Sequence, residues 1–453
     1  MANKSSTIPQ LFGTDGVRGV AGQHPLDRPT VRRLGAALVR ALPHGTASPH
    51  LLIGRDTRES GLWIEEELAH GAVGEGAEVT SVGVVPTPAV AYLTRAYPEY
   101  VAGVVISASH NPYQDNGIKV FSGKGEKFTE AVERHVEAIV ADRLWHAKSG
   151  DPSPVPRADL IGAYLAHLRA VFPEYSDVRG FRLAIDCANG ATTTVAPKLF
   201  NALGLDTIVI GDTPDGRNIN LGCGSTHPEK LAALVVERGC QLGVAFDGDG
   251  DRAIFVDEHG KIVDGDAVLL MCGGYLQREG RLKGNAIVAT VMSNIGLELA
   301  LKALGIELLR TSVGDKYVME EMMKRGLSLG GEQSGHIIFS DYLFTGDGLC
   351  TALNVLRTVA LTKRSLSDLA SQLTTYPQVL LNVRVRERVD LKTIAPVAAA
   401  IARVEGRVAN HGRLLIRYSG TEPLLRVMLE GKDQEEIRGW AQEIVDVVRE
   451  HLG

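Results

Sequence analysis

The stretch QLGVAFDGDGDRAIFVD, residues 241–257, decides the fold. Two short, almost continuously apolar runs flank a polar loop of three aspartates, two glycines and an arginine. Such runs are typical of strands buried on both faces, as in a mostly parallel sheet covered by helices. Similar runs recur, and segments with apolar residues at helical spacing separate them, such as PEKLAALVVERG (228–239). The other runs begin at Leu51, Val101, Phe181, Asp206 and Asn285. We predict an α/β protein with mostly parallel mixed sheets.

Three of the predicted strands run into a polar loop rich in Gly or Ser. The three segments in which a strand is followed by such a loop are VVISASHNP (104–112), VAFDGDGDR (244–252) and LGGEQSGH (329–336). Open α/β sheets bind ligands beyond the carboxyl ends of their strands, so we expect three related α/β domains that share a central cleft. A smaller C-terminal α+β domain follows the turn-rich TTYPQ (374–378). The predicted domains are 1–160, 161–262, 263–377 and 378–453.

The composition excludes several classes of protein. Among 453 residues, 54 Asp and Glu outnumber 48 Lys and Arg, so we expect no nucleic-acid partner. No run approaches 18 apolar residues and no signal peptide is evident, so we expect a cytoplasmic protein without a membrane partner. The five cysteines are widely spaced and odd in number, which favours buried free thiols over disulfides or a zinc site.

Asp247, Asp249 and Asp251 alternate with glycines and can point at one place. Two such charges about 4 Å apart repel by about 4 kcal/mol at an effective dielectric of 20, so the cluster needs a cation. Oxygen ligands suit Mg²⁺ or Ca²⁺, and we expect Mg²⁺ in a solvent-facing loop. A solvated acidic turn is the plain alternative. A calcium EF-hand loop is disfavoured, because Arg252 stands where that loop needs Gly and the flanking runs are strand-like.

The loop SASHNP (107–112) ends an apolar strand with two serines. A serine there can be a nucleophile or accept a phosphoryl group, although it can equally cap the following turn. His110, adjacent in sequence, is poorly placed to act as the base for this serine.

Two later loops offer groups for a phosphorylated sugar. In RYSGTEP (417–423), Arg417 can make two bonds to a phosphate, while Ser419 and its neighbours add hydroxyl and backbone N–H donors. A plain hairpin turn is the alternative. In GGEQSGH (330–336), Glu332 and Ser334 suit sugar hydroxyls, although many surface loops look alike.

These motifs, in this order, resemble the α-D-phosphohexomutase superfamily. The resemblance covers essentially the whole chain through GTDGVRG (13–19), SASHNP, DNGIK (115–119), DGDGDR (247–252), GGEQSGH and RYSGTEPLLRV (417–427). Within it, the motifs are most similar to bacterial phosphoglucosamine mutases, and phosphomannomutase/phosphoglucomutase is the alternative. The resemblance implies an intramolecular phosphotransferase with four domains around a deep cleft.

The resemblance also implies the chemistry. Ser109 would carry phosphoserine and interconvert glucosamine 6-phosphate and glucosamine 1-phosphate through a 1,6-bisphosphate, in the supply of UDP-N-acetylglucosamine for the cell wall. One Mg²⁺ would be held by Asp247, Asp249, Asp251 and a phosphate oxygen on Ser109. The phosphoserine adds about −1.5 to −2 charges, which a divalent cation balances. Hexose 1,6-bisphosphate or another phosphoryl donor would first phosphorylate Ser109.

The remaining site residues follow from the same resemblance. Residues expected around the reacting centre are Arg18, Lys119, Arg252 and His336, with Lys119 and His336 both open as the group that moves protons. Glu332 and Ser334 would bind sugar hydroxyls. The phosphate that is not being transferred would be bound by Arg417, Ser419, Gly420 and Thr421. Expected partners are a phosphosugar substrate and, from the family, a second copy in a homodimer.

Overall fold

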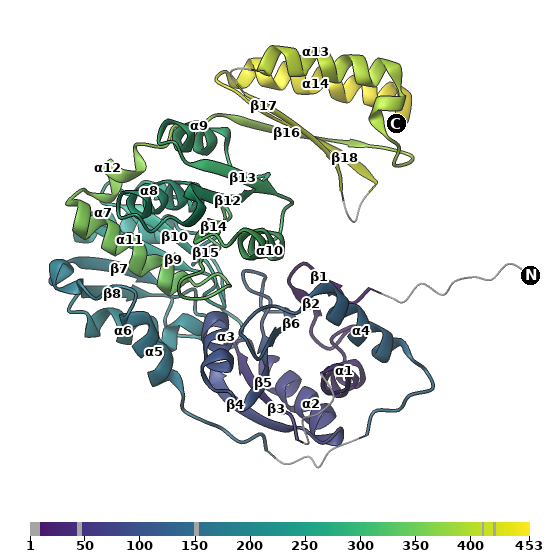
Figure 1. Ribbon diagram of the computed structural model, residues 1–453, viewed down its shortest axis with the longest axis vertical. Helices are drawn as coiled ribbons and strands as arrows, with labels where there is room; N and C mark the ends of the chain where they lie inside the picture. Colours follow the sequence, from purple (N-terminus) through teal and green to yellow (C-terminus); the bar gives the residue numbers. More distant parts are fainter. Residues whose placement is uncertain (1–9, 43–47, 149–153, 410–411, 420–422) are drawn as a thin grey trace, which may run out of the picture. The chain divides into compact units, whose positions relative to one another are not determined.

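The computed structural model describes residues 10–42, 48–148, 154–409, 412–419 and 423–453. The chain forms two compact units. The first contains residues 1–292 and 306–372, and the second contains residues 293–305 and 373–453. The first unit holds three mixed sheets, and the second holds one antiparallel sheet (Figure 1).

The first sheet has the strand order β1-β2-β6-β5-β3-β4. Its strand β3 pairs in parallel with β4 and β5, whereas the ladders from β5 through β6 and β2 to β1 are antiparallel. The apolar faces of β3 and β5 are buried against helices, with Ile53, Val104 and Ile106 fully buried. The strands are β1 (Phe12–Gly13), β2 (Gly16–Val20), β3 (His50–Arg55), β4 (Glu78–Val84), β5 (Tyr100–Ile106) and β6 (Asp115–Ser122). The helices are α1 (Arg28–Ala41), α2 (Gly61–Gly74), α3 (Thr87–Ala96) and α4 (Glu130–Ala141).

The second sheet has the order β11-β10-β9-β7-β8. Strand β7 pairs in parallel with β8 and β9, and the β9–β10 hairpin is antiparallel. The strands are β7 (Arg182–Asp186), β8 (Asp206–Ile210), β9 (Leu242–Phe246), β10 (Ala253–Asp257) and β11 (Ile262–Val263). The helices are α5 (Ile161–Arg169), α6 (Ala196–Ala202) and α7 (Glu229–Arg238), with short 3₁₀ turns at Tyr175–Val178 and Ala191–Thr194.

The third sheet repeats this plan in the order β13-β12-β14-β15. Strand β12 pairs in parallel with β13 and β14, and the β14–β15 hairpin is antiparallel. The strands are β12 (Ala286–Thr290), β13 (Glu307–Thr311), β14 (Leu329–Gly331) and β15 (Ile337–Phe339). The helices are α8 (Gly265–Arg278), α10 (Asp315–Arg325), α11 (Gly348–Thr362) and α12 (Leu366–Ala370). A 3₁₀ turn at Lys283–Asn285 precedes β12.

The second unit has an α+β architecture and combines residues 293–305 with the C-terminal segment from residue 373. Its sheet has the order β16-β18-β17 with antiparallel ladders, and α13 and α14 lie side by side along one face (Figure 1). The core includes Leu425 and Val427 from the sheet and Ile444 and Val448 from α14. The elements are α9 (Ile295–Ala303), β16 (Gln378–Arg384), a 3₁₀ turn at Leu391–Thr393, α13 (Ala395–Val408), β17 (Arg413–Tyr418), β18 (Leu424–Glu430) and α14 (Gln434–Leu452).

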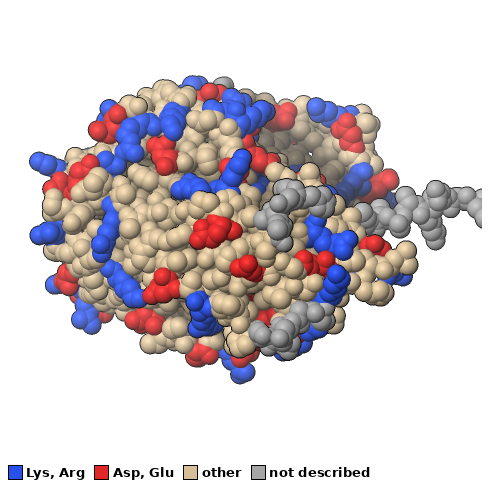
Figure 2. Space-filling model, turned by 60° about the horizontal axis from the view of Figure 1, so that its bottom comes forward, with Lys and Arg blue, Asp and Glu red and all other residues tan. Residues whose placement is uncertain are grey.

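These elements confirm the sequence-based expectations for the fold. All the quoted apolar runs are strands, 228–239 contains helix α7, and all five cysteines are buried free thiols. On the face drawn in Figure 2, side chains of Lys and Arg are interspersed with those of Asp and Glu. Among the described residues, no helix is long and apolar enough to span a bilayer. The predicted domain boundaries stay a prediction.

Candidate active site

The three predicted loops occupy the same position in their respective sheets. Each follows a strand of the parallel part of the sheet and turns the chain into an antiparallel neighbour. Residues 107–114 join β5 to β6, residues 247–252 join β9 to β10, and residues 332–336 join β14 to β15. The strand-like flanks of the aspartate loop rule out the EF-hand alternative, which requires helices.

Ser109 lies at the centre of this arrangement. Its backbone has φ 54°, a left-handed conformation that is rare outside Gly and common at functional sites. Its side chain is fully buried, and Oγ donates a hydrogen bond to Asp247 Oδ2 at 2.5 Å. Ser107 has a different role, because its Oγ donates to Asp56 and accepts from the backbone N–H of Ser109. The geometry therefore favours Ser109 over Ser107 as the reactive hydroxyl.

The three aspartates form one cluster, with a ligand oxygen from each within 4.8 Å of the others. They are buried at 0%, 1% and 3% exposure, so the expectation of a solvent-facing loop is wrong. The reason is Gly248, where a Cβ would come within 2.5 Å of Ser109 O and 2.8 Å of Asn220 Nδ2. Glycine thus lets this loop pack directly against the serine loop.

The donor set of this cluster fits a hard divalent cation. Burial and the two neighbouring carboxylates raise the pKa of Asp247 well above its ordinary value. Among the described residues, no hydrogen-bond donor reaches the buried oxygen Asp249 Oδ1. Crowded carboxylates with such an oxygen, beside the hydroxyl of Ser109, match the ligands that Mg²⁺ and Ca²⁺ prefer.

Lys119 lies beneath the cluster and is almost completely buried. Its ammonium group lies 2.9 Å from Asp249 Oδ2, 3.0 Å from Asp251 Oδ2 and 3.0 Å from Asp15 Oδ2. Burial opposes its charge, but these three carboxylates raise its pKa well above the ordinary value. Three donors on three carboxylates use the whole capacity of the ammonium group. Arg18 pairs with Asp15 and donates to Ala108 O at 3.3 Å, beside Ser109.

His336 and Arg252 approach the same cluster from the third and second sheets. His336 Nδ1 lies 3.6 Å from Asp251 Oδ1, and its Nε2 accepts from the backbone N–H of Gly346 at 3.0 Å. Burial lowers the pKa of His336, but Asp251 and Asp315 outweigh this effect and raise it. Arg252 Nε lies 3.8 Å from Asp251 Oδ1. The structure thus brings four cationic side chains close to the aspartates or to Ser109, namely Arg18, Lys119, Arg252 and His336, and their roles stay a prediction.

The sugar-loop candidates lie in the same unit. Glu332 Oε1 accepts from the backbone N–H of Gly314 at 3.3 Å. Burial lowers the pKa of Arg252, but the charges of Asp251, Asp247 and, to a smaller extent, Glu332 raise it and outweigh the burial. Ser334, at the turn of the β14–β15 hairpin, is exposed. Both side chains therefore belong to the loop that contributes His336.

The phosphate-loop candidates lie in the second unit, at the β17–β18 hairpin. Arg417 pairs across the ladder with Arg426, and burial together with Arg426 lowers the pKa of Arg417. Like charges opposite each other in a sheet are unfavourable, so this arrangement suits a bound anion. Ser419 is buried, and its carbonyl accepts from Arg388 at 2.6 Å. The predicted residues Gly420 and Thr421 lie outside the described residues.

Sequence reasoning missed several side chains of the site. Asp15 and Asp315 each contact Lys127, and Asp315 also lies 3.4 Å from His336 Nε2. Both lie in short polar stretches of the sequence, GTDGVRG (13–19) and VGDKY (313–317), but an isolated carboxylate gives no sign of its partners. The sequence indicates that His110 is poorly placed to act as the base for the serine. In the structure its Nδ1 lies 3.4 Å from Ser109 Oγ. Burial and the cations Arg252 and Arg18 lower its pKa to about 4.

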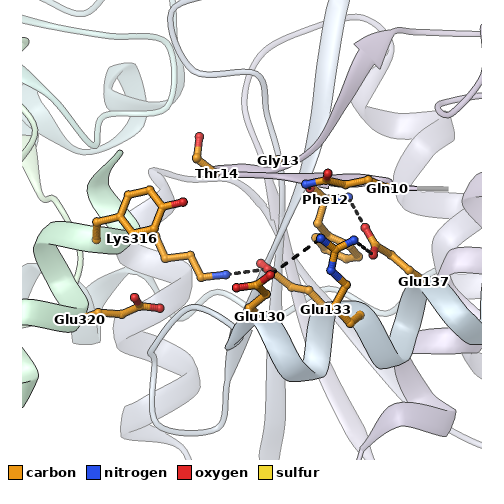
Figure 3. Close-up of a pocket in the computed structure, with 11 residues that line it drawn as sticks. Gln10, Phe12, Gly13, Thr14, Glu130, Glu133, Glu137, Lys316 and Glu320 are labelled. Atoms are coloured by element: carbon orange, nitrogen blue, oxygen red, sulfur yellow. Dashed lines mark hydrogen bonds and ion pairs between the residues drawn. The ribbon is translucent and has the colours of Figure 1, made fainter. Parts of the chain in front are cut away.

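A separate cavity of about 120 Å³ lies beside helices α4 and α10 (Figure 3). Lys316 Nζ bonds Glu133 Oε2 at 2.6 Å there, and Glu137 accepts from the backbone N–H groups of Leu11 and Phe12. The charged side chains around this cavity thus pair mainly with the protein itself, and they tie the N-terminal strand and α10 to α4.

Four protein-family models match successive parts of the chain. They are phosphoglucomutase/phosphomannomutase alpha/beta/alpha domain I at residues 9–146, domain II at 162–260, domain III at 264–376 and the C-terminal domain at 380–447. The chain is 50% identical over 450 residues to phosphoglucosamine mutase of Solibacter usitatus, covering 98% of this chain and 99% of that protein. It is 47% identical to phosphoglucosamine mutase of Syntrophotalea carbinolica, covering 98% of each. The chain belongs to the phosphoglucosamine mutase family.

Solved structures agree with this membership. A phosphoglucomutase/phosphomannomutase family protein of Burkholderia thailandensis has a TM-score of 0.79 at 25% identity, covering 98% of each chain. The fold of the Aspergillus fumigatus N-acetylphosphoglucosamine mutase, solved in complex with GlcNAc-6P and magnesium, matches with a TM-score of 0.64 at 18% identity, covering 99% of this chain and 97% of that one. The predicted superfamily and fold class are confirmed.

Proposed function

We propose that this member of the phosphoglucosamine mutase family interconverts glucosamine 6-phosphate and glucosamine 1-phosphate, with Ser109 as the phosphoryl carrier. The observation that carries the proposal is the Ser109 hydroxyl, which sits in a left-handed turn and bonds one of three clustered, buried carboxylates. A hydroxyl beside a cation site is the arrangement that phosphoryl transfer requires. The 50% identity to a phosphoglucosamine mutase supports the choice of sugar.

The transfer itself is a simple exchange of bonds. A sugar hydroxyl oxygen attacks the phosphorus on Ser109, the bond between phosphorus and Ser109 Oγ breaks, and the hydroxyl proton leaves to a base. In the second half, Ser109 Oγ loses its proton and attacks the phosphorus of the other phosphate, the bond between that phosphorus and the sugar oxygen breaks, and the released sugar oxygen takes up a proton. The product keeps the phosphate that it has just received. Mg²⁺, when bound by Asp247, Asp249 and Asp251, would supply positive charge against the phosphoryl oxygens.

The cationic side chains divide into two roles. Lys119 holds its charge through its three carboxylate contacts, so it suits stabilisation of the transferring group. His336, whose Nδ1 lies 3.6 Å from Asp251 Oδ1, is the better candidate for moving the proton, because an imidazole ordinarily changes its charge near neutral pH. Arg18, beside Ser109, and Arg252, beside Asp251, add fixed positive charge near the same carboxylates.

The substrate contacts stay proposals of the same kind. Glu332 and Ser334 bind sugar hydroxyls, and Arg417 with Ser419 binds the phosphate that is not transferred. Gly420 and Thr421 complete that loop in the proposal. The bisphosphate offers either phosphate in turn, so one anchor serves both half-reactions.

A coupled assay tests the proposed function. We expect turnover with glucosamine 6-phosphate at a kcat/KM at least tenfold above that with mannose 6-phosphate or glucose 6-phosphate, in the presence of Mg²⁺ and a hexose 1,6-bisphosphate. A preference for mannose 6-phosphate or glucose 6-phosphate would contradict the proposed specificity for glucosamine 6-phosphate. It would support the phosphomannomutase/phosphoglucomutase alternative. No turnover of any of the three would refute the proposal.

A further inference from the structure

Arg58 is a fully buried arginine for which neither the motifs nor the proposed mechanism has a role. It lies between β3 and α2, in the stretch GRDTR (54–58). Its guanidinium directs all five N–H donors at protein oxygens. Nε bonds Asp56 Oδ2 at 2.8 Å, and the other four donors reach backbone carbonyls of the serine loop, namely Ser109 at 2.9 Å, Asn111 at 2.8 Å, Asp115 at 3.0 Å and Pro112.

Three of these carbonyls belong to the irregular loop and the fourth belongs to Asp115, the first residue of β6. The bond to the Ser109 carbonyl is buried, and the other three are partly buried. Buried backbone oxygens must find donors, and a left-handed residue in the middle of the loop takes it out of the sheet ladder. One arginine therefore satisfies four carbonyls between residues 109 and 115, and it fixes the whole turn that presents the Ser109 hydroxyl. Lysine has only three donors without the planar fork, so it cannot reproduce this pattern.

A second side chain reaches two of the same oxygens from another sheet. Asn220 Nδ2 bonds Ser109 O at 2.9 Å and lies 3.2 Å from Asn111 O. Asn220 belongs to the loop between β8 and α7, and its own backbone N–H donates to Ala188 O. The carbonyl of Ser109 is thus held simultaneously by Arg58 from the first sheet's domain and by Asn220 from the second.

The opposite side of the serine is tied to the same arginine. Asp56 accepts from Arg58 and from Ser107 Oγ, and Ser107 Oγ accepts the backbone N–H of Ser109. Both the N–H and the C=O of Ser109 are therefore fixed by one connected network. The side-chain hydroxyl lies outside this backbone network and bonds Asp247.

We propose that Arg58 and Asn220 are positioning residues that clamp the carbonyl of Ser109, and thereby hold its hydroxyl in line with the carboxylate cluster for phosphoryl transfer. Neither contacts the substrate. A misplacement of a reacting atom by about 1 Å costs on the order of 100-fold in rate. The inference rests on the proposed function, in which Ser109 carries the phosphoryl group.

The test compares Arg58→Lys and Asn220→Gly with a matched control. Glycine suits position 220 because the backbone there has φ 58°. The control is Arg33→Lys, since Arg33 likewise donates to four backbone carbonyls, those of Ile139, Val140, Asp142 and Trp145, at the end of α4. Each variant is assayed for Tm, for kcat and KM with glucosamine 6-phosphate, and for phosphate on Ser109 by mass spectrometry.

We expect Arg58→Lys to lower kcat by about 100-fold or more while KM changes less than threefold. Asn220→Gly, with Arg58 still present, should lower kcat by about 5- to 20-fold, again with little change in KM. Arg33→Lys should lower Tm and leave kcat within twofold. This difference separates positioning from plain destabilisation, because Arg33→Lys shares the loss of backbone contacts and of stability but does not touch the carbonyl of Ser109.

The inference is overturned if a folded Arg58→Lys or Asn220→Gly protein turns over within twofold of the wild type. It is equally overturned if Arg33→Lys loses as much kcat as they do. If Arg58→Lys does not fold, Asn220→Gly decides alone. A wild-type protein without mutase activity, or with its phosphate elsewhere than on Ser109, would refute the proposed function instead.

Discussion

The substitution Asp247→Asn separates the cation site from the fold. Asp247 accepts from Ser109 Oγ and from the backbone N–H of Arg252, and asparagine keeps an oxygen for one of these bonds. What it removes is one of three negative charges within 4.8 Å. We expect the variant to be more stable than the wild type when divalent cations are chelated, and to gain less stability from Mg²⁺ than the wild type does.

The size of the stability difference between Asp247→Asn and the wild type follows from the protonation of the Asp247 carboxyl. Burial, Asp251 and Asp249 raise its pKa well above 3.8, so the folded protein binds a proton more tightly than the unfolded chain. In chelator, wild-type stability therefore falls as the pH rises above 3.8. At pH 7 the cost cannot exceed 1.36 × (7 − 3.8), about 4 kcal/mol, and this is the upper bound on the stability that the variant gains in chelator. Mg²⁺ at 100 times its Kd stabilises the wild type by about 2.7 kcal/mol.

The assay is urea unfolding at pH 7 with EDTA or with Mg²⁺. Asp257→Asn is the matched control, because this buried aspartate of the same hairpin accepts from the N–H groups of His259 and Lys261 outside the cluster. The control should be destabilised equally in both buffers. The reasoning fails if Asp247→Asn is the less stable protein in EDTA, or if Mg²⁺ stabilises it as much as the wild type.

Three further outcomes are expected. Ser109→Ala abolishes turnover, and peptide mapping of active wild type places the phosphate on Ser109; a phosphate on Ser107 would reverse the assignment. Arg417→Ala loses one bidentate contact of roughly 1.5–3 kcal/mol, so kcat/KM falls about 10- to 150-fold in both directions, and unchanged kinetics would remove Arg417 from the site. Burial raises the pKa of Asp347 to about 6 from 3.8. Wild-type stability therefore falls by up to about 3 kcal/mol as the pH rises from about 4 to 6, relative to Asp347→Asn. Urea midpoints at pH 4.5 and 7 measure the difference, and parallel curves would contradict it.

The strands and the site loops were predictable because their signals are local. Runs such as VAGVVIS and QLGVAFD are apolar on both faces, and only a strand covered on both sides uses such a pattern. The Asp-Gly alternation at 247–251 likewise predicted a cluster of carboxylates that could hold a cation, from charge alone. Its burial was missed, because the sequence does not show that Gly248 allows the serine loop to pack against it.

The partners of single charged residues could not be predicted. Asp15 lies 104 positions from Lys119 in the chain, yet their side chains meet at 3.0 Å. The contacts of Arg58 could not be predicted either, because the stretch GRDTR (54–58) looks like any other polar loop that follows a strand. Only the path of the serine loop around its guanidinium reveals four carbonyl contacts.

The sequence by itself determined the α/β class, the repeated strand–loop units and the chemical character of each loop. It could do so because hydrophobic periodicity and loop composition depend only on residues that are close together in the chain. The tertiary structure alone decided that Ser109 meets Asp247, 138 positions away, and that Lys119 takes three carboxylates. It also decided which serine of SASHNP faces the cluster. These outcomes depend on how separate sheets pack, and a contact between distant residues leaves no pattern in the local sequence because its energy arises only when both sides are in place.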